Sequence, residues 1–236
     1  MSRATKVTRK SEETRARILE AALALFRKRG FENTTMRDIA QESNVALGAA
    51  YYYFDSKDAL VMGFYERAQH DLAPLLENAL SKTQGQGLEE RLQAAIDVKF
   101  QYFAPNRKLL GALSAHIDPQ HPLSPFSEAT RAIRERDIAF LSAAIDGSKV
   151  RIPGDLKTHL PRLLWLYQMG LMLFWVYDRS PELGRTRLLF QKSLSIVVNL
   201  IRFSSLPLMR PVRRLATDLF EIVYGEEEPS LPEAIP

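Results

Sequence analysis

The amino-acid sequence predicts an all-α protein in which a small N-terminal domain of three helices precedes a larger C-terminal helical domain. Apolar residues recur at helical spacing along most of the 236-residue chain, and capping residues or glycines separate these segments. Hydrophobic residues make up 46% of the chain, which is enough to form a substantial core. We divide the chain into a basic N-terminal arm (1–10), a three-helix domain (11–57), a larger helical domain (58–225) and an acidic, proline-containing tail (226–236).

The first helix is predicted to begin at Ser11, because a serine side chain can cap a helix N-terminus. Glu12 and Glu13 follow, and their negative charge suits the positive end of the helix dipole. Gly30 should end the helix, since glycine readily adopts the left-handed C-cap conformation. The apolar side of this helix consists of Ile18, Ala22, Leu25 and Phe26.

Two shorter helices follow, separated by a tight turn. Thr35 and Asp38 have the spacing of a capping box and predict a helix start at that point. Asn44 suits the turn, because asparagine tolerates the left-handed conformation better than most residues. A third helix should cover about 47–53, and Ser56 should cap a fourth that runs to about residue 80. A helix, a tight turn and a second helix over about 35–54 form the arrangement of a helix-turn-helix DNA reader.

The third helix begins with small residues. In a helix-turn-helix protein the N-terminal end of this helix enters the major groove. Gly48, Ala49 and Ala50 would let its backbone approach base edges and thymine methyl groups. From the residues alone, an ordinary small helical bundle with surface tyrosines remains an alternative.

Three tyrosines and a phenylalanine follow the small residues. At about 100° per residue, neighbouring side chains cannot share one face of a helix. We therefore expect Tyr53 and Phe54 to turn toward the core, while Tyr51 and Tyr52 point outward and offer their hydroxyls to phosphates.

Positive charge is concentrated at the N-terminal end of the chain. Residues 1–57 hold 11 lysines and arginines against 7 acidic residues, whereas the remaining residues hold 21 of each sign. The first ten residues contain four cations and no acid, which suggests a polyanionic partner. A solvated tail without a partner is the alternative explanation of this arm. The four cations are Arg3, Lys6, Arg9 and Lys10.

Residues 14–60 resemble the N-terminal domain of the tetracycline-repressor (TetR) family of bacterial regulators. The resemblance covers about a fifth of the chain. The remaining length and helicity agree with this family, although its members vary widely there. The matching positions are Ile18, Leu19, Ala21, Ala22, Leu25, Phe26, Gly30, Thr34, Thr35, Ile39, Ala40, Val45, Tyr51, Tyr53, Phe54, Ser56, Lys57 and Leu60.

The resemblance implies a homodimer, a double-stranded operator with two-fold symmetry and a C-terminal domain that binds a small inducer. It also implies that Arg37 reaches a base or phosphate from the second helix, and that Lys57 contacts another phosphate. Residues 46–49 would form the base-reading end of the third helix. The DNA-binding residues that we expect are Thr35, Arg37, Ala46, Leu47, Gly48, Ala49, Tyr51, Tyr52 and Lys57.

Three positions depart from the common pattern of this family. Asn44 stands where glycine is frequent, and Ala46 stands where serine or threonine often caps the third helix. Ala50 replaces a frequent leucine, so that helix should be anchored less firmly. The motif survives, but the operator sequence cannot be derived from it.

After the fourth helix, the sequence predicts a polar linker at 81–87 and then further helices. The apolar run 163–177 contains one amide, Gln168, and is bounded by Arg162 and Asp178. A membrane span needs about 20 apolar residues, so we expect burial within a protein that has no membrane contact. In the related family this late helix faces a partner subunit and the ligand cavity, and 187–203, including Val197 and Leu200, would complete a four-helix interface. The predicted helices are 88–103, 106–117, 125–146, 163–177, 187–203 and 212–224.

A small hydrophobic ligand is expected in this domain, although each candidate residue taken singly is more often plain core than part of a ligand site. The four histidines lack metal-ligand spacing, and no nucleophile elbow or paired acids occur, so we expect no enzyme activity, metal or cofactor. The fourth helix is the evident link between the two domains, and Pro74 could bend it. The candidate ligand-binding residues are Phe100, Phe103, Leu110, His116, Phe140, Trp165, Met169 and Met172.

The sequence favours a cytoplasmic, nucleoid-associated repressor that a small apolar or aromatic ligand releases from a palindromic operator. The chain has no cysteine, which fits a reducing cytosol. Two alternatives remain: a regulator of the same fold without an inducer, and a helical ligand-binding or membrane-surface protein that does not bind DNA.

Overall fold

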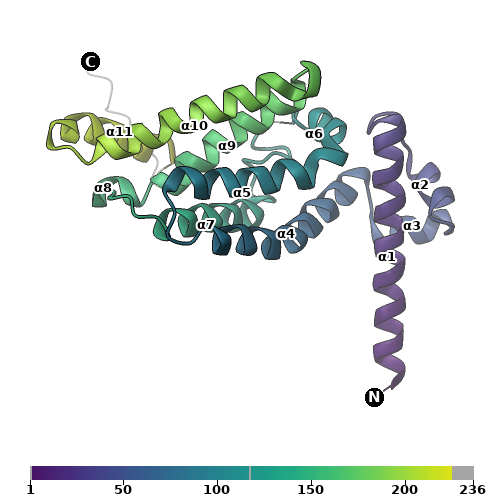
Figure 1. The fold of residues 1–236 in the computed structure, drawn as a ribbon. Helices are drawn as coiled ribbons and strands as arrows, with labels where there is room; N and C mark the ends of the chain where they lie inside the picture. The colour runs from purple at the N-terminus through teal and green to yellow at the C-terminus, as the bar shows by residue number, and fades with distance from the viewer. Residues whose placement is uncertain (1, 117, 225–236) are drawn as a thin grey trace, which may run out of the picture.

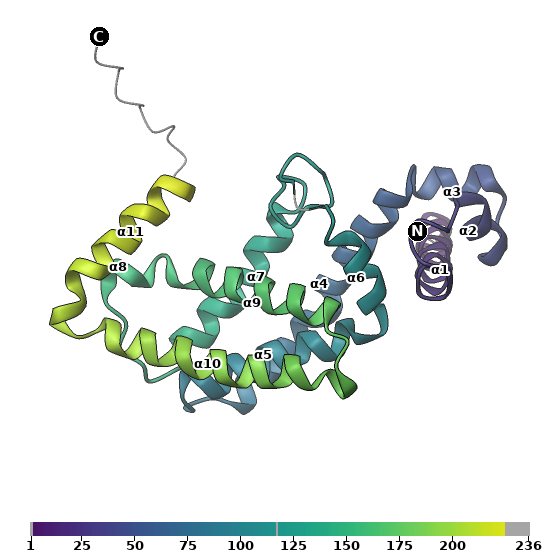
Figure 2. The same ribbon diagram turned by 90° about the horizontal axis from the view of Figure 1, so that it is seen from above.

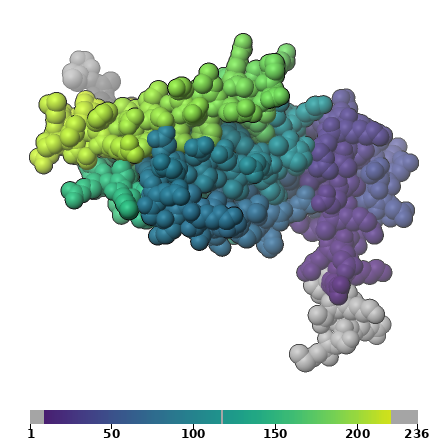
Figure 3. All heavy atoms as spheres, viewed as in Figure 1, coloured from purple at the N-terminus to yellow at the C-terminus, as the bar shows by residue number. Residues whose placement is uncertain are grey.

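The computed structural model describes residues 2–116 and 118–224, and every regular element within these ranges is a helix. A small N-terminal domain stands as a separate lobe at one end of a larger helical body (Figure 3). Its three helices lie close together, and α4 leads from them into the larger body (Figure 1). These elements are α1 (Ser2–Arg29), α2 (Met36–Glu42), α3 (Leu47–Tyr53) and α4 (Lys57–Lys82).

The larger body is a stack of helices in which α9 and α10 run antiparallel side by side (Figures 1 and 2). The predicted tail, 226–236, lies outside the described residues. The elements of this body are α5 (Leu88–Phe103), the 3-10 turn η1 (Ala104–Asn106), α6 (Arg107–Leu113), α7 (Arg131–Asp146), α8 (Gly154–Lys157), α9 (Leu160–Tyr177), η2 (Pro181–Leu183), α10 (Gly184–Ser204), η3 (Pro207–Met209) and α11 (Arg210–Tyr224).

The first helix begins nine residues earlier than its sequence signal predicted. Ser11 does not cap α1 but lies inside it, where its hydroxyl donates a hydrogen bond of 3.3 Å to the hydroxyl of Tyr53. Residues 2–10 contain no glycine or proline, so nothing in the chain stops the helix there. The predicted arm is therefore a helical extension of α1, whereas the end of α1 at Gly30, with φ +88°, is confirmed.

The sequence also placed two boundaries in the larger body incorrectly. The helix predicted over 106–117 ends at Leu113, and the helix predicted from Pro125 begins only at Arg131. Buried hydroxyls hold the segment before α7 in turns. The Thr130 hydroxyl donates a hydrogen bond of 2.6 Å to the Ser124 carbonyl, and the Ser127 hydroxyl donates one of 3.1 Å to the Pro122 carbonyl. These side-chain bonds compete with helical backbone bonds and delay the start of α7.

The core of the N-terminal domain extends beyond its three helices. Leu60, Val61 and Phe64 from the beginning of α4 are buried in it. Leu109 and Leu113 from α6 belong to the same apolar cluster. The small domain therefore packs against α6 as well as continuing into α4, so α4 is not the only link between the domains.

Arg91 ties three helices of the larger body together. Its side chain is buried, and it donates hydrogen bonds to the carbonyls of Leu80 (2.9 Å) and Thr83 (3.0 Å) at the end of α4. It also donates to Ala143 (3.1 Å) and Ala144 (2.8 Å) near the end of α7. Helix ends leave such carbonyls without partners, so one guanidinium supplies donors to carbonyls at the ends of two helices at once.

The apolar run of α9 is buried on its inner side and exposed on its outer side. Trp165, Leu171 and Trp175 are buried, whereas Phe174 and Tyr177 are exposed. No helix in the described ranges is both long and apolar enough to span a bilayer.

Candidate nucleic-acid interface and ligand cavity

A capping box positions α2, as the sequence predicts. The Thr35 hydroxyl accepts a hydrogen bond of 3.2 Å from the Asp38 backbone N–H, and the Asp38 carboxylate accepts one of 2.9 Å from the Thr35 backbone N–H. Hydrogen bonds from the Thr35 side chain and backbone, and the nearby Arg29, hold the pKa of Asp38 below its ordinary value. Because both capping groups are satisfied, the start of α2 is fixed without an external partner.

The turn between α2 and α3 also follows its sequence signal. Asn44 adopts a left-handed conformation with φ 52°. Ala46 is the N-cap of α3 and makes no side-chain capping bond, as its residue type implies. The first backbone N–H groups of α3 therefore remain available to an external acceptor such as a phosphate.

Gly48 lies on an open face at the start of α3. A Cβ atom at this position would meet no atom of the protein within 4 Å. Ala46 and Leu47 are exposed beside it, and Ala49 is half-buried. Gly63 differs, because a Cβ atom there would lie 2.9 Å from the Phe54 ring. Packing within this chain thus explains Gly63 but not Gly48, whose small size leaves room for an outside partner.

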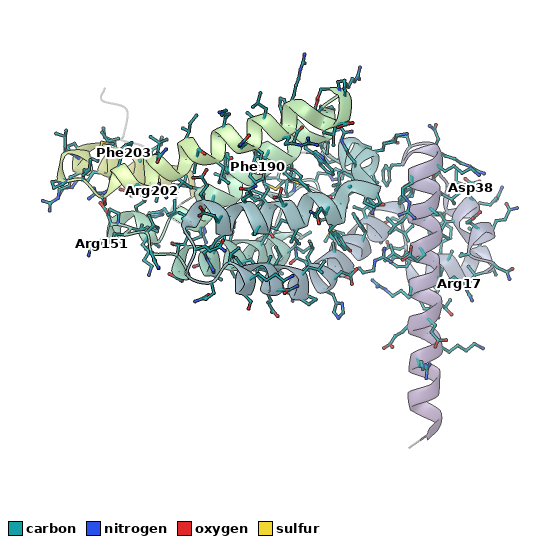
Figure 4. The ribbon with its side chains drawn as sticks, viewed as in Figure 1. Arg17, Asp38, Arg151, Phe190, Arg202 and Phe203 are labelled. Carbon is teal, nitrogen blue, oxygen red and sulfur yellow. The ribbon has the colours of Figure 1, made fainter. Side chains whose placement is uncertain are left out.

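The tyrosines divide between surface and interior as predicted. Tyr51 is 48% exposed and Tyr52 is 82% exposed, so both residues lie on the surface. Tyr53 is half-buried and meets Tyr52 edge-on, and Phe54 is 2% exposed in the core. Figure 4 shows Asp38 on the same small domain, at its outer side.

The two expected cations differ in their surroundings. Arg37 on α2 is exposed beside the capping box. Lys57 is half-buried, donates a hydrogen bond of 2.8 Å to the Phe31 carbonyl and lies 4.4 Å from the centroid of the Phe31 ring. An ammonium group has three donors, so Lys57 can hold this internal bond and still reach a phosphate.

The larger body contains a partly open cavity of about 330 Å³ between α4, α5, α6, α7 and α9. This volume lies at the lower end of the range of small-molecule sites. Of the residues predicted to bind a ligand, Phe103, Leu110, Trp165, Met169 and Met172 belong to its lining.

The other three predicted residues lie away from the lining. Phe100 packs between Trp175 and Phe190, with ring centroids 5.4 and 5.8 Å away. Phe140 packs on the main core of the larger body. His116 stacks on His121 at 4.0 Å in the turn after α6. No described group of histidines or carboxylates has the arrangement of a metal site.

The cavity wall contains a buried ring of hydrogen-bonded polar side chains that was not predicted from the sequence. The Lys99 ammonium donates to the Asp137 carboxylate and, at 2.8 Å, to the amide oxygen of Gln168. The amide nitrogen of Gln168 in turn donates a hydrogen bond of 2.9 Å to the Asp137 carboxylate. These residues come from α5, α7 and α9, so only the tertiary fold brings them together. The lone amide in the apolar run 163–177 was the one available signal.

Another polar group of the wall is Tyr65 from α4. Burial raises the pKa of its hydroxyl well above the ordinary value. The phenol is neutral at physiological pH with or without this shift, and a neutral phenol can donate a hydrogen bond to a ligand.

Exposed apolar side chains lie along the outer sides of α9 and α10. They are Leu173, Phe174, Tyr177, Leu188, Leu189, Ile196, Leu200 and Phe203. Figure 4 shows Phe203 and Arg202 at the end of α10 that leads to α11. A large group of exposed apolar side chains on neighbouring helices is typical of an interface. Val197 packs instead on the core of the larger body of its own chain, and Ile196 takes the exposed position.

Curated relatives match mainly the N-terminal part of the chain. The HTH-type transcriptional regulator TtgR of Pseudomonas putida is 45% identical over 56 residues, which are 24% of this chain and 27% of that protein. The HTH-type transcriptional regulator AcrR of Shigella flexneri is 33% identical over 72 residues, 30% of this chain and 34% of that protein. The aligned segments thus span about a third or less of either relative.

Solved structures share the fold over most of the chain. Salmonella enterica GusR has a TM-score of 0.57 and 24% identity, with 80% of this chain and 95% of that chain covered. A TetR transcription regulator from Haloarcula marismortui has a TM-score of 0.59 and 19% identity, with 80% and 98% covered.

Two family models together cover both domains. The model of bacterial regulatory proteins of the tetR family matches residues 18–62. The model of the tetracyclin repressor-like C-terminal domain matches residues 91–219, more than half of the chain. Proteins of this family are transcriptional regulators and not enzymes. The chain belongs to the TetR family of bacterial regulatory proteins.

Proposed function

We propose that this chain is a dimeric DNA-binding transcriptional repressor, which a small hydrophobic ligand releases from a palindromic operator. It would act in the cytoplasm on nucleoid DNA. The exposed N-terminal end of α3 would read base edges, with Thr35 and Arg37 beside it. The exposed hydroxyls of Tyr51 and Tyr52 would bind phosphates.

The observation that carries the ligand response is the dual position of α6. Leu113 belongs both to the apolar core of the DNA-binding domain and to the cavity lining. Leu109 lies in that core, and Leu110 lines the cavity and packs against the core from outside. A ligand that displaces α6 therefore acts directly on the packing of the small domain.

The apolar surface on α9 and α10 supports the dimer. Two such helices from each subunit would form a four-helix interface. In a dimer, two recognition helices must lie about 34–36 Å apart to enter successive major grooves. A ligand shifts this spacing only if it binds the released arrangement better than the DNA-bound one.

DNA binding is tested with an Ala49→Glu variant in a gel-shift assay on DNA flanking the protein's own gene. The carboxylate would face base acceptors and phosphates, so we expect loss of specific binding with the dimer intact. Ala73→Glu, on α4, places the same charge outside the interface and should bind normally. Normal operator affinity of Ala49→Glu would mean that α3 does not enter the groove.

Ligand release is tested by measuring ligand affinity with and without operator. Coupling of about 100-fold is typical, near 2.7 kcal/mol. Reciprocity requires that operator DNA weaken ligand binding by the same factor. Equal affinities would show a regulator of this fold whose cavity does not control DNA binding.

A further inference from the structure

The cavity wall carries an unequal number of positive and negative side chains. Within the described residues, its charged members are Lys99, Arg134 and Asp137. The remaining lining is mostly leucine, methionine, phenylalanine and tryptophan. A mostly apolar wall with two cations and one carboxylate leaves one positive charge to be balanced.

Lys99 does not supply the unbalanced charge. Its side chain is only 4% exposed, and it forms an ion pair with Asp137. Gln168 bonds to both partners, so each carboxylate oxygen of Asp137 already accepts a hydrogen bond. A ligand would have to break this ring to use either charge, and breaking a buried pair is strongly unfavourable.

Arg134 is the cation that remains. Its Nη1 atom donates hydrogen bonds to the backbone carbonyls of Pro125 (2.8 Å) and Ser127 (3.1 Å). Within the described part of the chain, no carboxylate lies within 4.0 Å of it, and its Nε and Nη2 atoms donate to no residue. A guanidinium stays charged at any physiological pH and can bind a carboxylate through two donors.

We infer that the cavity binds a hydrophobic monocarboxylic acid, with its carboxylate at Arg134 and its hydrocarbon or aromatic body against Phe103, Trp165 and Met172. This inference rests on the proposed function and defines the chemical class of its ligand. One negative charge on the ligand balances the charge of the wall. A cationic ligand would meet Arg134 and find Asp137 already bound to Lys99.

The experiment compares three probes of nearly equal size by isothermal titration calorimetry at pH 7.5: decanoic acid, decanamide and decylamine. We expect the protein to bind decanoate at least tenfold more tightly than the amide, because a hydrogen bond to a charged group contributes roughly 1.5–3 kcal/mol. Decylamine should bind most weakly.

Arg134→Gln should remove the preference for the acid and leave amide affinity within about twofold. Arg134→Lys retains the charge and should keep part of the preference, although it also loses the bonds to the Pro125 and Ser127 carbonyls. Comparing the lysine and glutamine variants therefore separates the effect of the charge from the role of Arg134 in holding the loop that contains Pro125 and Ser127. Arg136→Gln, an exposed position on the same helix, serves as the matched control and should behave like the unmodified protein.

Equal affinity of the unmodified protein for acid and amide would overturn the inference, as would a preference that survives Arg134→Gln. Failure of all three probes to bind would also overturn it. Operator affinity is measured on the same preparation by fluorescence anisotropy. Because it does not depend on these probes, operator binding tests the proposed regulator separately.

Discussion

Arg27 on α1 donates a hydrogen bond of 3.1 Å from Nη1 to the side-chain oxygen of Asn106, which lies at the start of α6. This bond crosses between the two domains beside the contact of Leu109 and Leu113 with the N-terminal core. The proposed ligand signal therefore has a path from α6 to α1 that does not pass through α4.

Arg27→Met should change the coupling between ligand and operator while leaving each separate affinity within about twofold. The substitution keeps an apolar stem but removes the donor, so coupling should change by about fivefold, the value of one hydrogen bond near 1 kcal/mol. The measurement is ligand affinity with and without operator. Lys28→Met, at the neighbouring exposed position, should leave coupling unaltered. Identical coupling in both variants would exclude this bond from the signal.

Gly48→Ala should separate the stability of the protein from its affinity for DNA. Nothing lies within 4 Å of the new methyl group, and alanine favours the helix by about 0.5–1 kcal/mol over glycine, so thermal stability should rise or hold. Operator affinity should fall, because the methyl group occupies space that the approaching DNA needs. Gly154→Ala, in the first turn of α8 and equally free of neighbours, is the control. If both variants bind operator equally well, the backbone at residue 48 makes no close approach to DNA.

Sequence signals that span only a few residues predicted α2, the turn and α3 well. Thr35 and Asp38 define the start of α2, and Asn44 defines the turn before α3, because capping and left-handed geometry depend on local residue chemistry. The limits of α3 at residues 47 and 53 are confirmed for the same reason. Ser11 misled the prediction, since its hydroxyl bonds to Tyr53, a partner 42 positions away.

The cavity could be predicted only in part, because its polar members are separated in sequence. Large apolar residues such as Trp165 and Met172 were identified from their composition and helical setting. Lys99 and Asp137 resemble ordinary surface residues until the packing of α5 against α7 brings them together. The buried hydroxyl of Thr130 likewise had no sequence signal, and it delays α7 and shapes the loop over the cavity.

Replacing Ile196 and Leu200 with glutamate should produce monomers or aggregates. Both residues are 60% exposed on α10 in a single chain, so the monomer should tolerate the charges. In a dimer the carboxylates would be buried without partners, which is strongly unfavourable. Sedimentation velocity measures the outcome, with Leu75→Glu on the exposed side of α4 as the control. An unaltered dimer would place the interface on another surface.

The helical extension of α1 should increase DNA affinity without affecting sequence preference. The helix begins at Ser2, so residues 2–10 lengthen α1 on the N-terminal side of Ser11 by roughly 1.5 Å per residue. Arg9 is already paired with Glu13 at 3.0 Å in an exposed i,i+4 contact. Substituting Arg3, Lys6 and Lys10 with glutamine leaves that pair in place and keeps residues that favour a helix.

The slope of log affinity against log salt should become shallower by about 0.9 for each phosphate contact that the triple variant loses, or about 2.7 in total. Binding to operator and to unrelated DNA should weaken by similar factors, because phosphates carry no sequence information. The control variant replaces Lys82, Lys149 and Lys192, which are exposed on the larger body, with glutamine. It has the same net charge, so any effect of overall charge appears in both variants. Equal slopes for the two would mean that the extension of α1 contacts no phosphate and is a solvated helix.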